Sequence, residues 1–178
     1  MSVLRTPRLE LLPLTLAMVE AVLLGRREEA ERLALARMPE RWPNPELVER
    51  AFAMSLERVR ADSTVRLWGA RVMIAVEEPD RRVVGSIVFR GEPDEDGVAE
   101  IAYGVEERSQ GQGYATEAVG ASVAWALGHP GVRAVQASTF AWHRASVRVL
   151  EKVGMTVAGI RDHETMGEMV VYERRLMP

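Results

Sequence analysis

The most constraining feature of this 178-residue sequence is a junction between a strand pattern and a helix pattern, which runs from Ile101 to Thr116. The strand pattern ends at Val105, and a polar loop with glycines at positions 111 and 113 separates it from the helix pattern. A helix start exposes unpaired N–H groups and the positive end of the helix dipole, and glycines let the backbone approach an anion closely. Arg108 adds a cation that suits a phosphate oxygen. The junction therefore predicts a phosphate-binding loop over Arg108–Gly113.

Two other phosphate-binding motifs fit this junction poorly. A P-loop requires Gly-Lys followed by Ser or Thr, whereas Gly113 lies between Gln112 and Tyr114. A dinucleotide-binding loop has a third glycine and follows the first strand of its unit. Here the third glycine position holds Thr116, and the loop follows the fourth predicted strand. A nucleotide phosphotransferase is therefore disfavoured.

Apolar periodicity divides the rest of the chain into strands and helices. Thr15 is a potential cap for a helix, and Asn44-Pro45-Glu46 is a second helix start. The order is one strand, helices, three strands, a helix, a strand, a helix and two strands. This order predicts an α+β or mixed α/β fold, in which helices cover a central sheet. The predicted strands are Arg8–Pro13, Leu67–Val76, Val83–Phe89, Val98–Val105, Val132–Ser138, Met155–Ile160 and Met169–Leu176, and three of the predicted helices are Arg26–Arg37, Gly113–Leu127 and Arg144–Val153.

Composition excludes several classes of function. The net charge is −3 with Arg and Glu interspersed, so the chain lacks the basic stripe of a nucleic-acid binder. It contains no cysteine, which excludes disulfides, thiolate zinc sites and a cysteine nucleophile. No apolar run approaches the ~20 residues that span a bilayer, and the N-terminus does not resemble a signal peptide. We therefore expect a single domain over residues 1–178 in the cytoplasm, with no metal and with neither nucleic acid nor membrane as a partner.

Two segments resemble motifs of the GNAT superfamily of acetyltransferases. The loop resembles the acetyl-CoA motif (Arg/Gln)-x-x-Gly-x-(Gly/Ala), here Arg108-x-x-Gly111-x-Gly113. The segment from Ala145 to Met155 resembles the second cofactor motif, Asn-x-x-Ser followed by a helix and Glu-Lys-x-Gly-Phe, of the branch that contains the ribosomal-protein serine and alanine N-terminal acetyltransferases. Tyr114-Ala115-Thr116-Glu117-Ala118 and the opening Arg5-Thr6-Pro7-Arg8-Leu9 are also similar to that branch. The resemblance implies a GNAT-like fold, with a mostly antiparallel sheet of six to seven strands, splayed between the fourth and fifth and flanked by helices.

The resemblance implies acetyl-CoA as co-substrate, with its pyrophosphate on the loop. Gly104 is expected to mark a bulge that splays its strand from the next and admits the pantetheine arm. His143 stands where the branch has Asn, so it either replaces that contact to the pantetheine arm or caps the following helix. The implied cofactor-binding residues are Tyr103, Val105, Arg108, Ser109, Gln110, Gly111, Gln112, Gly113, Tyr114, Ala115, Thr116, His143 and Ser146.

Three groups receive catalytic roles from the resemblance. Glu100 is the candidate general base, with a solvated strand carboxylate as the alternative. Ser146 is the candidate acid toward the leaving thiolate, with a helix-capping role as the alternative. Other GNAT branches use a tyrosine as that acid, and its position here is Leu150. The Val105 N–H is the implied donor to the oxyanion.

The predicted function is an acetyl-CoA-dependent N-acetyltransferase, in which a primary amine attacks the thioester directly. An α-amine, with a pKa near 8, has a much larger neutral fraction at neutral pH than a lysine, with a pKa near 10.4. The resemblance implies an acceptor that is either a protein N-terminus, ribosomal-protein-like, or a small amine. Trp42 is a candidate wall of the acceptor site or a core residue, and Trp142 is predicted to be a packing residue.

The alternative function is a non-catalytic module of GNAT fold that binds or senses acyl-CoA. Its motivation is the histidine at position 143 and the missing tyrosine at position 150. Dimers are common among similar proteins, so a homodimer is a further option.

Overall fold

The structure is a computed structural model, and it describes residues 2–40, 60–76, 80–163, 165 and 167–176. Its strands form one eight-stranded sheet in the order β1-β2-β3-β4-β5-β6-β8-β7. All neighbouring pairs are antiparallel except β5 and β6, which are parallel. The strands are β1 (Leu4–Arg5), β2 (Leu9–Pro13), β3 (Arg71–Ala75), β4 (Arg82–Phe89), β5 (Val98–Val105), β6 (Ala134–Phe140), β7 (Thr156–His163) and β8 (Gly167–Arg175).

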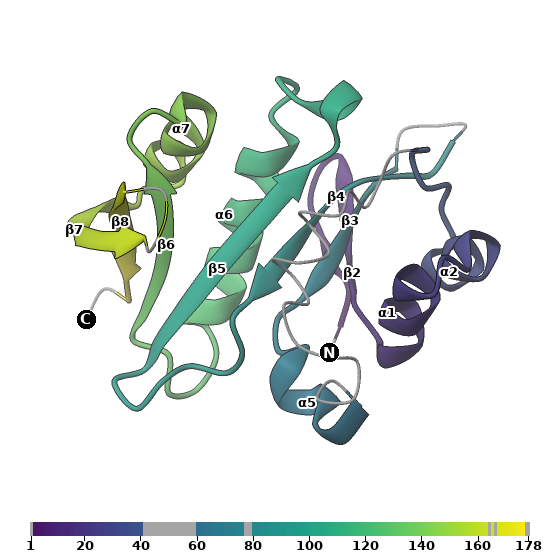
Figure 1. Cartoon of the computed structure of the whole chain (residues 1–178), viewed down its shortest axis with the longest axis horizontal. Helices are drawn as coiled ribbons and strands as arrows, with labels where there is room; N and C mark the ends of the chain where they lie inside the picture. Colours follow the sequence, from purple (N-terminus) through teal and green to yellow (C-terminus); the bar gives the residue numbers. More distant parts are fainter. Residues whose placement is uncertain (1, 41–59, 77–79, 164, 166, 177–178) are drawn as a thin grey trace.

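Helices cover both faces of this sheet (Figure 1). Successive side chains of a strand point to opposite faces, and β3 is buried on both. Met73 and Ala75 join the core under α6 and α7, whereas Val72 and Ile74 join the core under α1 and α2. The helical segments are α1 (Leu16–Leu23), α2 (Arg27–Ala34), α5 (Ser63–Arg66), the short 3₁₀ helix η1 (Glu107–Ser109), α6 (Tyr114–Leu127) and α7 (Arg144–Lys152).

The predicted mixed α/β fold with a splayed, mostly antiparallel sheet is confirmed. The sheet has eight strands rather than six or seven, because Leu4–Arg5 pairs with β2 as an additional short edge strand. The strand predicted from Leu67 begins only at Arg71, since α5 and a turn with Gly69 at a φ of 65° precede it. The predicted strand Val98–Val105 is confirmed at both ends. The helix start at residues 44–46 and Trp42 lie outside the described residues.

Arg71 is a buried cation that the strand pattern did not predict. Its side chain is fully buried, donates from Nη1 to the Gly69 carbonyl at 2.8 Å, and lies 4.2 Å from the ring centroid of Trp125 on α6. Burial lowers the pKa of Arg71 to about 10. The ring contact offsets part of the cost of desolvating the charge. This residue therefore belongs to the packing between β3 and α6.

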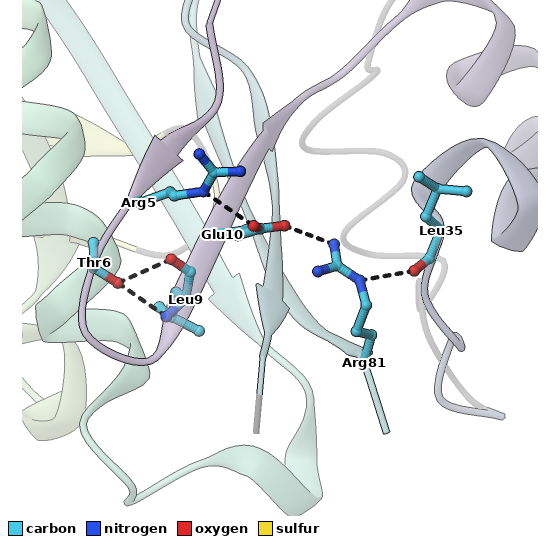
Figure 2. A network of polar contacts seen from close by, with 6 residues as sticks. All are labelled: Arg5, Thr6, Leu9, Glu10, Leu35 and Arg81. Atoms are coloured by element: carbon cyan, nitrogen blue, oxygen red, sulfur yellow. Dashed lines mark hydrogen bonds and ion pairs between the residues drawn. The ribbon is translucent and has the colours of Figure 1, made fainter. Parts of the chain in front are cut away.

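Ion pairs stabilise the edge of the sheet formed by β1 and β2, near the N-terminus (Figure 2). Glu10 on β2 accepts from Arg5 at 3.1 Å and from Arg81 at 2.6 Å. The Arg81 bond is the main cause that lowers the pKa of Glu10. Arg81 also donates to the Leu35 carbonyl at 3.0 Å, which ties the end of α2 to the start of β4. Thr6 closes the turn between β1 and β2 by hydrogen bonds with the backbone of Leu9.

Candidate active site

Strands β5 and β6 run side by side only at their beginnings. Val98–Glu100 pairs with residues 134–136, and within the described residues no pairing of these strands continues beyond Glu100. Figure 1 shows the two strands diverging toward their C-terminal ends. The pairing of β5 with β4 continues regularly through Gly104, so the predicted bulge at this residue is wrong.

The register of β5 decides where its backbone groups point. The Glu106 N–H donates to the Val84 carbonyl at 2.9 Å, and Val105 lies opposite Gly85. In an antiparallel pair, hydrogen-bonded and non-hydrogen-bonded positions alternate along the strand. Val105 is therefore in a non-hydrogen-bonded position, and its N–H points away from β4, toward the side of β5 from which β6 has diverged.

Hydrogen bonds between residues of the loop itself and the end of β5 hold the segment that follows β5 in place. Glu106 accepts from the Arg108 N–H at 3.0 Å and from the Ser109 hydroxyl at 2.5 Å. Ser109 is buried, so this bond also satisfies a hydroxyl that has little access to water. Gln110 Nε2 donates to the Val105 carbonyl at 3.1 Å. These bonds fix the loop against the end of β5.

The second half of the loop is open and electropositive. Gly111 and Gly113 have φ values of 75° and 86°, and a Cβ at Gly111 would meet nothing within 4 Å. Gly113 is the N-cap residue of α6, where no side chain accepts a hydrogen bond from the helix start. Gln112 Nε2 donates to the Arg108 carbonyl at 3.1 Å. The Arg108 side chain is exposed, and no described residue offers it a polar partner. An anion can reach the N–H groups of α6 here with a free guanidinium beside it.

Tyr103 on β5 and Ser146 on α7 form a hydroxyl pair where α7 packs beside the diverging strands. The Tyr103 hydroxyl lies 3.0 Å from Ser146 Oγ and donates to the Ser146 carbonyl at 3.3 Å. Burial raises the pKa of Tyr103 to about 12, and the bond with Ser146 offsets only part of that increase. The helix-capping alternative for Ser146 is wrong, because α7 begins at Arg144 and the N-cap position belongs to His143.

Glu100 lies on the face of β5 opposite to Tyr103. Arg161 Nη1, from β7, lies 3.3 Å from both carboxylate oxygens, and Arg90 Nε lies 3.5 Å from one of them. The Glu100 side chain is 19% exposed. We call Arg90, Glu100 and Arg161 the Glu100 cluster. Glu100 is therefore a partly solvated strand carboxylate that two exposed arginines pair with. Strand periodicity could not predict either arginine, because it does not show which distant strands meet.

His143 and its neighbours form an exposed aromatic group at the end of β6. The ring of Trp142 stacks on Phe140 at 5.2 Å with an angle of 7°, and His163 lies 5.8 Å from Phe140. Trp142 is 66% exposed, so its predicted packing role is wrong. His143 makes no side-chain cap, and its Nδ1 lies 3.5 Å from the Thr139 hydroxyl. His143 thus occupies the N-cap position of α7, but its side chain forms no capping hydrogen bond.

The described residues contain neither a metal-binding cluster nor a helix that could span a membrane. No group of three or more His, Cys, Asp or Glu side chains is placed to hold a metal ion. Within this part of the chain, no helix combines the length and the apolar character that a membrane span requires.

Comparisons with known proteins agree with this architecture. A family model described as an acetyltransferase (GNAT) domain matches residues 8–156. YjdG, an uncharacterised N-acetyltransferase of Bacillus subtilis strain 168, is 27% identical over 154 residues, which are 86% of this chain and 89% of that protein. A GNAT-family acetyltransferase of Bacillus anthracis has a TM-score of 0.65 at 18% identity, with 98% of both chains covered. RimL, a ribosomal L7/L12 alpha-N-protein acetyltransferase solved with coenzyme A, has a TM-score of 0.63 at 17% identity and the same coverage.

The family match extends over most of the chain, and the chain therefore belongs to the GNAT acetyltransferase family. It is an acyltransferase, and members of its family transfer an acetyl group from acetyl-CoA. The solved relatives share its fold at low sequence identity.

Proposed function

We propose that this protein is an acetyl-CoA-dependent N-acetyltransferase that acts on a primary amine. The observation that carries the proposal is the arrangement of β5. One strand carries Glu100 on one face and directs the Val105 N–H into the gap beside β6, and it leads directly into the Arg108–Gly113 loop. A donor anchored at the loop would thus extend along the gap toward Glu100.

The residues present fit the diphosphate of coenzyme A. The two glycines have left-handed backbone conformations and place no side chain of their own over the start of α6. Arg108 would pair with a phosphate oxygen, and the loop residues Ser109–Gly113 with Tyr114, Ala115 and Thr116 would surround the diphosphate through the helix start. Tyr103, Val105, His143 and Ser146 would line the pantetheine arm, because they lie on β5 and α7 beside the gap between β5 and β6.

Acetyl-CoA, when bound, supplies an acetyl group activated as a thioester. The residues of the protein then position the amine, stabilise the developing negative charge and transfer protons. Glu100 lies five positions from Val105 along the strand, so it accepts a proton from the amine through bridging water, and the Val105 N–H stabilises the oxygen that gains negative charge. Ser146 donates a proton to the departing sulfur and regains one from solvent, and its hydroxyl is oriented by Tyr103 at 3.0 Å. The proposed catalytic groups therefore come from two residues on β5, Glu100 and Val105, and from Ser146 on α7.

The acceptor is either a protein N-terminus or a small amine. An α-amine suits the site because Glu100 has to deprotonate only a group whose ordinary pKa is near 8. The likeness to RimL, described as an acetyltransferase of a ribosomal protein's α-amine, supports the peptide acceptor.

The proposal also includes a single domain over residues 1–178 acting in the cytoplasm. A homodimer is an option, which light scattering after gel filtration would test.

Release of free coenzyme A tests the proposed reaction directly. The chain contains no cysteine, so a thiol reagent reads only the released coenzyme. We expect purified protein with acetyl-CoA to release thiol in the presence of peptides with a free α-amine, and not with N-acetylated versions of the same peptides. Coenzyme binding without release across peptides and small amines would favour a sensing module instead. Absence of coenzyme binding would contradict the donor site itself.

A further inference from the structure

The N-terminal segment of the chain lies against the first turns of α6. The Glu117 carboxylate accepts from the Thr6 hydroxyl at 2.6 Å and from the Arg8 N–H at 2.8 Å. Arg8 Nε and Nη2 both reach the other carboxylate oxygen at 2.8 Å. All of these donors come from two residues more than a hundred positions away in the chain. Glu117 is therefore bound by the segment that includes Thr6 and Arg8.

Arg8 also contacts the loop that we assign to the diphosphate. Its Nη1 donates to the Gln112 carbonyl at 2.9 Å, and its guanidinium lies 4.8 Å from the ring centroid of Tyr114. A Cβ at Gly113 would come within 3.3 Å of Arg8 Nη2. A single side chain thus touches the end of the loop and the beginning of the helix.

The negative charge of Glu117 at the start of α6 would oppose the binding of an anion there, and Arg8 compensates this charge. A carboxylate in the first turns of a helix is favourable for the helix dipole, but it repels an anionic ligand at the same helix end. Burial raises the pKa of Glu117, and the hydrogen bonds from Thr6 and Arg8 outweigh that effect, so the pKa is lowered overall. Glu117 is consequently charged at neutral pH. Its compensation by Arg8 leaves the helix start available for an anion.

We infer that Arg8 is a positioning residue for the diphosphate-binding loop: it neutralises Glu117 and holds the Gln112 carbonyl, so that the N–H groups at the start of α6 face the ligand. This inference rests on the proposed donor site. It assigns a role in coenzyme binding to the Arg5–Leu9 opening of the chain, which contributes no residue to the donor site proposed above.

Binding of coenzyme A, measured by calorimetry, tests the inference with a set of variants. We expect Arg8→Gln to weaken coenzyme A binding at least about tenfold, because it removes charge-assisted bonds and exposes the Glu117 charge. Glu117→Gln keeps the Arg8 cation and its bond to Gln112, so we expect a loss below about threefold. The double variant should recover at least about threefold over Arg8→Gln, since the uncompensated carboxylate is gone.

The controls separate positioning from simple support of the fold. Arg5→Gln removes an arginine of the same segment that pairs with Glu10 instead, and it should bind coenzyme A like the wild type. Pantetheine, which lacks the diphosphate, should bind all variants equally, and kcat at saturating acetyl-CoA should not change. Equal losses in Arg8→Gln and Glu117→Gln, or parallel losses for pantetheine, would overturn the inference. So would wild-type coenzyme A affinity in Arg8→Gln.

A conservative variant protects the test against misfolding. If Arg8→Gln does not fold, Arg8→Lys can replace it in the test. Lysine keeps the positive charge beside Glu117, but its single nitrogen has to serve both the Glu117 carboxylate and the Gln112 carbonyl. We expect its coenzyme A affinity to fall about threefold with a small change in Tm, and an unchanged affinity would count against the inference. A wild-type protein that does not bind coenzyme A would instead refute the donor site, which is a separate failure.

Discussion

The Arg108–Gly113 loop and the Glu100 cluster both depend on β5, but the fold holds them in different ways. The loop is supported by backbone carbonyls, by a buried serine and by Arg8 at 2.9 Å from the Gln112 carbonyl. The Glu100 cluster consists of contacts of 3.3–3.5 Å between the Glu100 carboxylate and two arginines, which are 46% and 64% exposed. The bonds of the loop are shorter and more numerous than those of the cluster, and one of them satisfies the buried Ser109 hydroxyl. Exposed ion pairs contribute little and exchange easily.

This difference suits the two proposed ligands. A loop that is already in place binds the same donor in every reaction without a cost of ordering. A cluster held by weak ion pairs can release Glu100 when an amine arrives. We therefore regard the donor side as preformed and the acceptor side as adjustable, and four substitutions test that comparison.

The largest effect is expected for Glu100→Gln. The amide cannot accept the proton, so kcat should fall by about 10²–10⁴-fold. Affinity for coenzyme A should stay the same, because Glu100 lies near the start of β5, whereas the loop that would bind the diphosphate follows its end. Steady-state kinetics together with calorimetry measure the two effects. Glu173→Gln is the matched control, because this carboxylate is also bound by an arginine and lies on β8 of the same sheet, separated from β5 by β6. A loss of kcat below tenfold in Glu100→Gln would remove the base from the proposal.

A substitution at Gly85 should disturb the preformed side through the backbone. A Cβ at this position would lie 2.2 Å from the Gly104 carbonyl oxygen on β5. Overpacking of this kind costs about 1–3 kcal/mol, so Gly85→Ala should lower Tm by about 3–10 °C. It should also weaken coenzyme A binding, since the displaced strand end carries the loop. Gly159→Ala on β7, where a Cβ meets nothing within 4 Å, is the control. Equal melting temperatures for the two variants would contradict the close approach.

Tyr103→Phe should have a moderate effect on the hydroxyl pair. Loss of one hydrogen bond to Ser146 is worth about 1 kcal/mol, so kcat should fall about fivefold. Tyr172→Phe, a buried tyrosine on β8, is the control for the loss of a hydroxyl alone. If both variants turn over like the wild type, Tyr103 does not orient Ser146.

The raised pKa of Tyr103 also predicts how stability depends on alkaline pH. Its folded pKa, about 12, lies above the unfolded value of 10. The neutral hydroxyl therefore stabilises the fold fully below pH 10, and this contribution of about 2–3 kcal/mol disappears as the pH rises toward 12. Denaturant unfolding of wild type and Tyr103→Phe between pH 9 and pH 12 measures it. The variant should lose less stability over this range.

The smallest effect is expected for Arg161→Gln on the adjustable side. Exposed ion pairs contribute about 0–1 kcal/mol, so Tm should change by less than about 3 °C. Removal of the competing cation should raise kcat/KM for the amine about two- to fivefold. Arg60→Gln, which breaks a different exposed pair with Glu20, should leave kcat/KM unchanged. A large decrease of kcat/KM in Arg161→Gln would show that Arg161 takes part in catalysis and does not merely occupy Glu100.

The sequence by itself predicted the elements around β5 and α6, because their signals are local. Alternation over Val98–Val105, the glycines after it and the small-residue face of the following helix are contiguous, and the structure begins and ends these elements within a residue of the prediction. The loop between them was identified for the same reason, since its glycines and Arg108 lie within a few positions of one another.

Only the tertiary structure decided which distant side chains meet. The pairing of Glu100 with Arg161, of Tyr103 with Ser146 and of Arg8 with Glu117 joins residues that lie 61, 43 and 109 positions apart. Strand order and register determine such contacts, and a single strand's periodicity shows which face a residue occupies but not what lies across from it. The buried Arg71 and the exposed Trp142 have the same cause, because burial depends on neighbours that only the folded chain brings together.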